Sequence, residues 1–121
     1  MEKTLIFIVE KTFFTAFLCG IIFCIIAVIF LKNPPKEINY LYGYRTQSSM
    51  KNQEVWDFSQ RFSSQKMLES GVGLIILSFL PIFFNIDEVV NIIISLLLCL
   101  GTCVYMIAAT EKAIKKKFPN T

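Results

Sequence analysis

Three long stretches of this 121-residue chain contain no charged side chain: residues 12–31, 70–86 and 89–110. Each is close to the ~20 helical residues needed to cross a bilayer core of ~30 Å. Hydrophobic residues make up 55% of the chain, more than a soluble domain of this size can bury. We therefore expect an all-α membrane protein with a single domain. Its three transmembrane helices are predicted at about residues 5–31, 67–86 and 89–110.

Small side chains recur at every fourth residue in two of the predicted spans. The rows are Ala16, Gly20 and Cys24 in the first span, and Ser95, Cys99 and Cys103 in the third. Small residues at this spacing let another membrane helix approach closely, and we expect the row in the third span to meet the first helix. All four cysteines lie in spans and none forms a C-x-x-C pair, which favours packing over a disulfide framework or a zinc site. Pro81 is expected to kink the second helix.

The polar segment 39–57 separates the first two spans and contains three of the four tyrosines and the only tryptophan. Tyr40, Tyr42 and Tyr44 alternate, so an extended backbone would point them to one side. Gly43 permits a turn or a close backbone approach. Because apolar spans flank this segment, we expect it to lie at one face of the bilayer and to carry recognition.

The second half of this segment has the pattern of a short amphipathic helix in the first loop. Ser48 or Ser49 is a candidate N-cap for a helix that begins near Met50. One apolar stripe follows at helical spacing, formed by Val55, Phe58 and Phe62. Such a helix is expected to lie on the membrane surface or across the ends of the spanning helices.

Arg45 has two interpretations. Its guanidinium can bind a carboxylate or a lipid phosphate through two parallel hydrogen bonds. Alternatively, it pairs with Glu54 or Asp57 and fixes the loop against the amphipathic helix. These two acids are three residues apart and share a helix face, and they are expected to complement the helix N-terminus rather than to act as catalytic carboxylates.

The composition argues against several classes of function. The chain has no histidine, the commonest general base and metal ligand, so we expect no enzymatic activity, no metal and no cofactor. The net charge of +3 comes from basic residues that flank apolar runs, which indicates the lipid bilayer, and not nucleic acid, as the direct partner. The spans lack the central ionisable group that ion-coupled transporters usually need, while a homo-oligomer stays open.

The distribution of basic residues predicts the orientation of the chain. With three spans, the first loop and the C-terminus share one side. That side carries six Lys and Arg residues in 32–66 and four in 112–117, against Lys3 and Lys11 on the other. The positive-inside rule therefore predicts a bacterial cell-membrane protein with a cytoplasmic first loop and C-terminus, and with the N-terminus outside.

Residues 39–56 resemble a motif of the SdpI family of small bacterial membrane proteins. Besides Met50 and Lys51, the matching positions are the ones we take as the candidate partner-binding or loop-organising site: Asn39, Tyr42, Gly43, Tyr44, Arg45, Thr46, Ser49, Asn52, Glu54 and Trp56. The flanking spans fit as well. The chain departs from the family after Trp56, where an Ala-Asn pair is usual, and Gln60 is the candidate substitute for that asparagine.

This resemblance implies a role in immunity or signalling. The family's namesake protects a producing cell from a secreted peptide toxin and holds a transcriptional repressor at the membrane, and it has about twice as many spans. By analogy, the chain is expected to give tolerance to a membrane-active peptide toxin, to bind a regulatory partner, or both. The alternative is a structural or stress-related membrane protein, including a holin-like oligomer.

Overall fold

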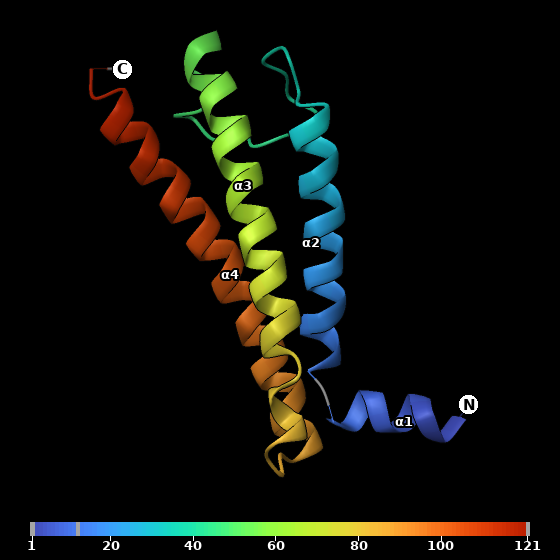
Figure 1. Cartoon of the computed structure of the whole chain (residues 1–121). Coiled ribbons are helices and arrows are strands. Elements are labelled where there is room, and N and C mark those ends of the chain that lie inside the picture. The colour runs from blue at the N-terminus through green and yellow to red at the C-terminus, as the bar shows by residue number, and fades with distance from the viewer. Residues whose placement is uncertain (1, 12, 121) are drawn as a thin grey trace.

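A computed structural model of the chain describes the backbone of residues 2–11 and 13–120, and the side chains of residues 2–7 and 13–120. Its elements are α1 (Glu2–Lys11), α2 (Phe14–Lys32), α3 (Gln53–Leu77), the 3₁₀ helix η1 (Leu80–Ile82) and α4 (Glu88–Lys117). In the described part, no strand occurs and three helices are long and apolar enough to cross a membrane: α2, α3 extended by η1, and α4. They run up, down and up in one bundle (Figure 1). The predicted all-α membrane fold is confirmed.

The first predicted span is divided into two helices. We expected one helix over residues 5–31, but α2 begins only at Phe14, and α1 leaves the bundle at a wide angle (Figure 1). Phe13 explains where α2 begins. Its ring is buried against Ala16 and Leu74, and its backbone N–H donates to the carbonyl of Ser78 at 2.8 Å. The start of α2 is therefore tied to the end of α3.

The amphipathic segment is helical, but it is the first half of α3 and not a separate helix. The predicted caps Ser48 and Ser49 were wrong, because Asn52 is the N-cap and its side chain accepts a hydrogen bond from the Val55 N–H at 2.9 Å. No proline interrupts the chain between Gln53 and Leu77, so the helix continues directly into the second span.

Pro81 ends the second span instead of kinking it. A proline has no N–H to donate to the carbonyl four residues earlier, here that of Leu77, which is the last residue of α3. The chain tightens into η1, with Pro81 buried, and then turns into α4. The predicted second span, residues 67–86, therefore extends nine residues beyond the end of α3, which itself begins 14 residues earlier than predicted.

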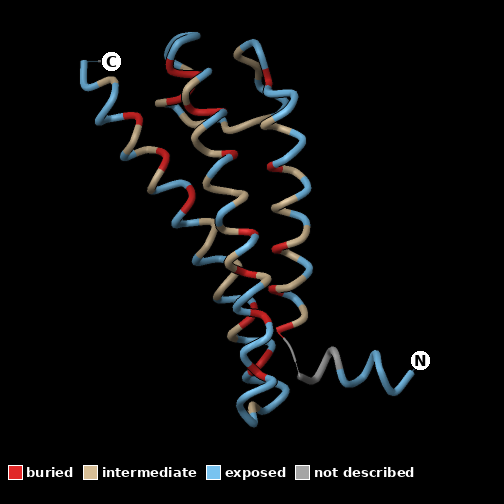
Figure 2. The backbone as a smooth tube through the Cα atoms, viewed as in Figure 1, coloured by how far each residue is buried: buried red, intermediate tan, exposed pale blue. Residues whose placement is uncertain are grey.

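Two glycines set the distance between α2 and α3. A Cβ added to Gly20 would lie 2.7 Å from the Gly71 carbonyl oxygen, and one added to Gly71 would lie 2.7 Å from Cys24 Sγ. The small-residue face of α2 thus packs on α3, as the buried positions along the facing sides of the helices indicate (Figure 2). The row in α4 meets α2 as expected, since Cys99 packs against the cluster that includes Ala16.

Candidate functional site

The loop between α2 and α3 is attached to α3 through a backbone-like pairing with Gln60. The Tyr44 N–H donates to Gln60 Oε1 at 2.8 Å, and Gln60 Nε2 donates to the Tyr44 carbonyl oxygen at 2.8 Å. Gln60 is 2% exposed, so its amide would be costly to bury without these partners. Gln60 was the candidate substitute for the asparagine of the family motif, and this pairing is the contact that it makes with the loop.

Gly43 makes that pairing possible. Its φ is +100°, a left-handed conformation that residues with a Cβ rarely adopt. A Cβ at this position would also lie 2.7 Å from Gln60 Oε1 and 2.8 Å from Pro35 Cγ. Both the backbone conformation and the close approach therefore require glycine here.

Trp56 attaches the beginning of the same loop, near Pro35, to α3. Its indole is fully buried, and Nε1 donates to the Pro35 carbonyl oxygen at 2.8 Å. Trp56 is not part of the predicted apolar stripe of Val55, Phe58 and Phe62, yet it is the largest fully buried side chain of the described residues. The indole closes the beginning of the loop onto the first turns of α3.

Glu111 joins the loop to α4, and sequence reasoning missed it. Tyr44 Oη donates to Glu111 Oε2 at 2.9 Å, and Thr46 Oγ1 donates to the same oxygen at 3.1 Å. Burial, together with the hydrogen bond to Glu111 and its negative charge, raises the pKa of Tyr44 well above its ordinary value. Glu111 is the single acid before a run of lysines, and that is the only sequence signal that set it apart.

Ser49 and Thr46 form a small closed turn that orients the Thr46 hydroxyl. The Thr46 N–H donates to Ser49 Oγ at 2.8 Å, and the Ser49 N–H donates to Thr46 Oγ1 at 3.2 Å. Ser49 is fully buried and acts inside the loop instead of capping a helix. Thr46 Oγ1 accepts a hydrogen bond from the Ser49 N–H and donates its own proton to Glu111 Oε2.

The first part of the loop forms an exposed tip. Asn39 Oδ1 accepts from the N–H groups of Leu41 and Tyr42, both at 2.9 Å, and Arg45 Nη1 donates to the Tyr40 carbonyl oxygen. Tyr40 is 84% exposed and Leu41 is 85% exposed. The chain thus fixes this backbone with side-chain hydrogen bonds while it leaves two large side chains outside the fold.

In the described part of the chain, the three tyrosines do not point to one side, and Arg45 does not form the ion pair that was one of its two interpretations. Tyr40 and Tyr42 are exposed whereas Tyr44 is half-buried, because Gly43 turns the chain between them. Among the described residues, Arg45 makes no ion pair with Glu54 or Asp57. Glu54 is exposed in the first turn of α3, where its charge suits the helix dipole. Of the ten candidate site residues, the seven from Asn39 to Ser49 lie in the loop, whereas Asn52 caps α3 and Glu54 and Trp56 lie at its beginning.

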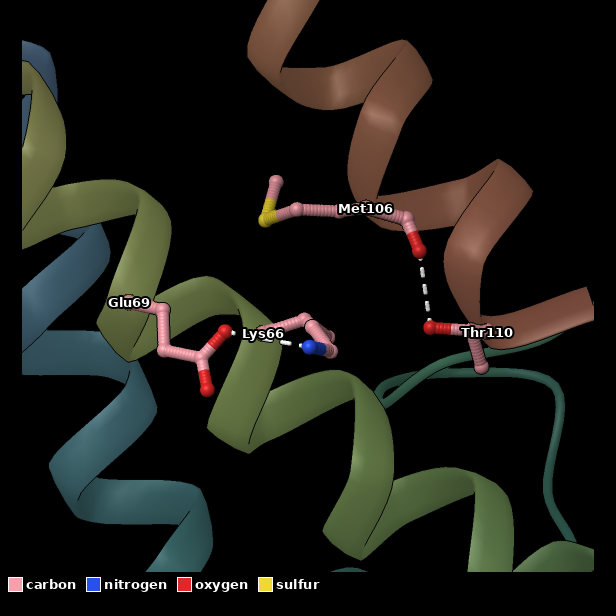
Figure 3. A network of polar contacts seen from close by, with 4 residues as sticks. All are labelled: Lys66, Glu69, Met106 and Thr110. Atoms are coloured by element: carbon pink, nitrogen blue, oxygen red, sulfur yellow. Dashed lines mark hydrogen bonds and ion pairs between the residues drawn. The ribbon is translucent and has the colours of Figure 1, made fainter. Parts of the chain in front are cut away.

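A cavity of about 270 Å³ lies beneath Tyr44, between α2, α3 and α4. Its lining is almost entirely apolar and includes Phe23 and Phe30 of α2, Met67 of α3 and Met106 of α4. Figure 3 shows Met106 pointing from α4 toward α3, one turn before Thr110, whose hydroxyl donates to the Met106 carbonyl oxygen at 2.7 Å. On α3, the same view shows Lys66 paired with Glu69 at 3.1 Å.

Two comparisons with known proteins identify the family of this chain. The model of the SdpI/YfhL protein family matches residues 36–109. The chain is also 38% identical over 97 residues to a Bacillus subtilis (strain 168) protein named "Uncharacterized protein YfhL", covering 75% of this chain and 78% of that protein. This chain belongs to the SdpI/YfhL family. No solved structure matches it.

The region matched by the SdpI/YfhL family contains the segment 39–57 and the Gln60 side chain that pairs with Tyr44. It ends two residues before Glu111. Both partners of the Tyr44–Gln60 pairing thus lie inside the matched region, whereas Pro35 and Glu111, which accept hydrogen bonds from Trp56 and Tyr44, lie outside it.

Proposed function

We propose that this SdpI/YfhL family member binds a peptide or protein partner at one face of the membrane through the tip of the 39–57 loop. In this role it gives tolerance to a membrane-active peptide toxin, holds a regulatory protein such as a transcriptional repressor at the membrane, or does both. The proposed role is binding and not catalysis. It extends the family resemblance to this chain by analogy.

One observation carries the proposal: the loop is rigidly fastened, yet it exposes Tyr40, Leu41 and Arg45. Large exposed side chains on a fixed backbone bind with a low entropic cost, because the loop is already ordered. Tyrosine and arginine are also the residue types enriched in binding hot spots. The fastening through Gln60 and Glu111 keeps the tip in place relative to the bundle.

Expression in a toxin-sensitive bacterium tests this function. Cells that express the native chain are expected to survive challenge by at least one of a panel of membrane-active bacterial peptides better than cells with an empty vector. The double variant Tyr40→Ala, Leu41→Ala should lose this protection. Phe84→Ala is the matched control, since Phe84 is 61% exposed at the opposite end of the bundle. Equal protection by the double variant at equal membrane levels would refute recognition by the tip.

Arg45 provides a second test of the same site. Arg45→Lys keeps the charge but cannot form two parallel hydrogen bonds with a carboxylate or phosphate, so we expect protection to fall. Lys36→Arg, a change in the same loop, should leave protection intact. If Arg45→Lys protects fully, the guanidinium geometry has no role in recognition.

We further propose that the loop and the C-terminus face the cytoplasm. The support is the excess of basic residues at the end of the bundle that carries the loop, ten against two at the other end. A partner of the tip would then be a cytoplasmic protein, or a peptide that has entered the inner leaflet.

A further inference from the structure

We infer that the cavity beneath Tyr44 binds a single hydrocarbon chain of a bilayer lipid. This inference stands apart from the proposed partner of the loop tip, because it rests on a different part of the molecule. The cavity lies between α2, α3 and α4 and is partly open at the surface of the bundle, and Gly43 and Tyr44 of the loop line its roof.

The size and lining of the cavity fit a hydrocarbon group. An apolar cavity of ~150 Å³ stays dry and already binds benzene, and this one has about 270 Å³. Phe23, Phe30 and Ile107 supply most of its aromatic and branched walls. Met67 and Met106 add flexible, polarizable side chains that adapt to a ligand without a fixed shape.

The polar groups at the roof are already used. The N–H and carbonyl groups of Tyr44 pair with Gln60, and its hydroxyl donates to Glu111. The Ser63 hydroxyl, also at the wall, donates to the Gln60 carbonyl oxygen at 3.3 Å. A polar ligand would find few open partners here, so an apolar group is the occupant that the chemistry favours.

The position of the cavity indicates that its occupant comes from the bilayer. α2 and α4 diverge toward the loop end (Figure 1), and the cavity lies in the wedge between them, at the loop end of both spans. Ile107 on its wall is 50% exposed, so the wedge opens sideways where lipid surrounds the protein. The nearest apolar molecules at this depth are the acyl chains of the adjacent leaflet.

Photocrosslinking in liposomes tests the inference. The full chain is reconstituted with a phosphatidylcholine that carries a photoactivatable diazirine in one acyl chain, and adducts are located by tandem mass spectrometry. Lipid at the outer surface will label the exposed positions Leu97 and Val104, which serve as the reference. We expect the cavity positions Met67, Cys103 and Met106 to be labelled at least as strongly, although they are far less exposed.

Two variants link the labelling to the cavity. Cys103→Phe fills it, and Ile107→Trp narrows its opening from a half-exposed position that should not disturb folding. Each is expected to lower labelling at Met67 and Met106 by several-fold while Leu97 is unchanged. Gly101→Ala is the control, because a Cβ there meets nothing within 4 Å.

Two results would overturn the inference. One is labelling at the outer positions without labelling in the cavity. The other is unchanged cavity labelling in both variants.

Discussion

At the scale of single residues, Gly43 controls whether the loop can pair with α3. In Gly43→Ala, the backbone would have to keep φ near +100° and the new methyl would meet Gln60 and Pro35. Such strain costs roughly 1–3 kcal/mol, and we expect the free energy of unfolding to fall by that amount. Unfolding of the detergent-solubilised protein in a mixed-micelle titration would measure it.

Gly101 supplies the comparison for this prediction. It lies in the interior of α4 with open space around it, and Gly101→Ala should match or slightly exceed the native stability because alanine favours a helix by up to ~1 kcal/mol. If Gly43→Ala and Gly101→Ala have equal free energies of unfolding, the close contact at Gly43 does not affect stability.

Tyr44 predicts a loss of stability at high pH. Its pKa is raised in the folded protein, from an ordinary value of about 10, by burial and by the hydrogen bond and charge of Glu111. The protonated phenol therefore stabilises the fold fully below pH ~10, and this contribution is lost as the pH rises further, because the unfolded chain ionises first. The stability difference between the native chain and Tyr44→Phe should be constant below pH ~10 and should shrink above it.

Glu111→Gln separates the effect of charge from the effect of burial. It removes the carboxylate charge that disfavours tyrosinate, so the pKa of Tyr44 should decrease while burial still keeps it raised. Ultraviolet absorbance of tyrosinate would follow this, because subtracting the titration of a matched Tyr44→Phe variant isolates the signal of Tyr44. That signal should move to lower pH in Glu111→Gln. Glu54→Gln, at an exposed acid, should leave the Tyr44 signal unchanged. An unaltered Tyr44 signal in Glu111→Gln would exclude the carboxylate as a cause.

At the scale of elements, the crossing of α2 and α3 depends on Gly20 and Gly71. Gly71→Ala would place a methyl 2.7 Å from Cys24 Sγ and 2.8 Å from the Gly20 carbonyl oxygen, so the helices must move apart. Overpacking of this kind typically costs about 1–3 kcal/mol. We expect that loss in the same mixed-micelle titration.

Gly73 is the matched control, two residues further along α3. A Cβ there meets nothing within 4 Å, so Gly73→Ala should keep or slightly improve stability. Both variants add one methyl group to α3 at nearly the same depth, but only the methyl at position 71 meets α2. If both lower stability alike, intrinsic helix effects and not the crossing of α2 and α3 would be responsible.

Helix boundaries show where sequence patterns stopped being informative. Runs without charge placed the spans, because hydropathy alone decides which segments enter lipid. The beginning of α2 depends on a backbone bond from Phe13 to Ser78, which is 65 positions away in the chain. The buried face of α3 depends on where Pro35 and Tyr44 lie, so the apolar stripe included half-buried Phe58 and left out fully buried Trp56.

At the scale of the whole molecule, the contacts of the motif residues depend on positions far from them in the chain. Tyr44, Thr46 and Ser49 were candidates for organising the loop, and they form hydrogen bonds within it or to α3 and α4. Their attachment to α4 was not foreseeable, because Glu111 is 67 and 65 residues from Tyr44 and Thr46 and lies in a tail that composition marks as basic. Local spacing carries no information about which distant acid a loop hydroxyl will meet.

The same bundle makes a prediction about sidedness. The loop, the N-terminus of α3 and the C-terminus of α4 lie at one end (Figure 1), so a reporter at the C-terminus also reports the side of the loop. A C-terminal fusion to green fluorescent protein should fluoresce, and a fusion to alkaline phosphatase, which is active only after export, should be inactive.

Replacing Lys112, Lys115, Lys116 and Lys117 with glutamine should weaken this bias, because basic residues close to a span set its orientation. Matched replacement of Glu37, Glu54 and Asp57 by their amides should not, since acids contribute little to orientation. Active phosphatase on the native chain would place the loop outside, and the partner of Tyr40 and Leu41 would then have to be sought among extracellular peptides.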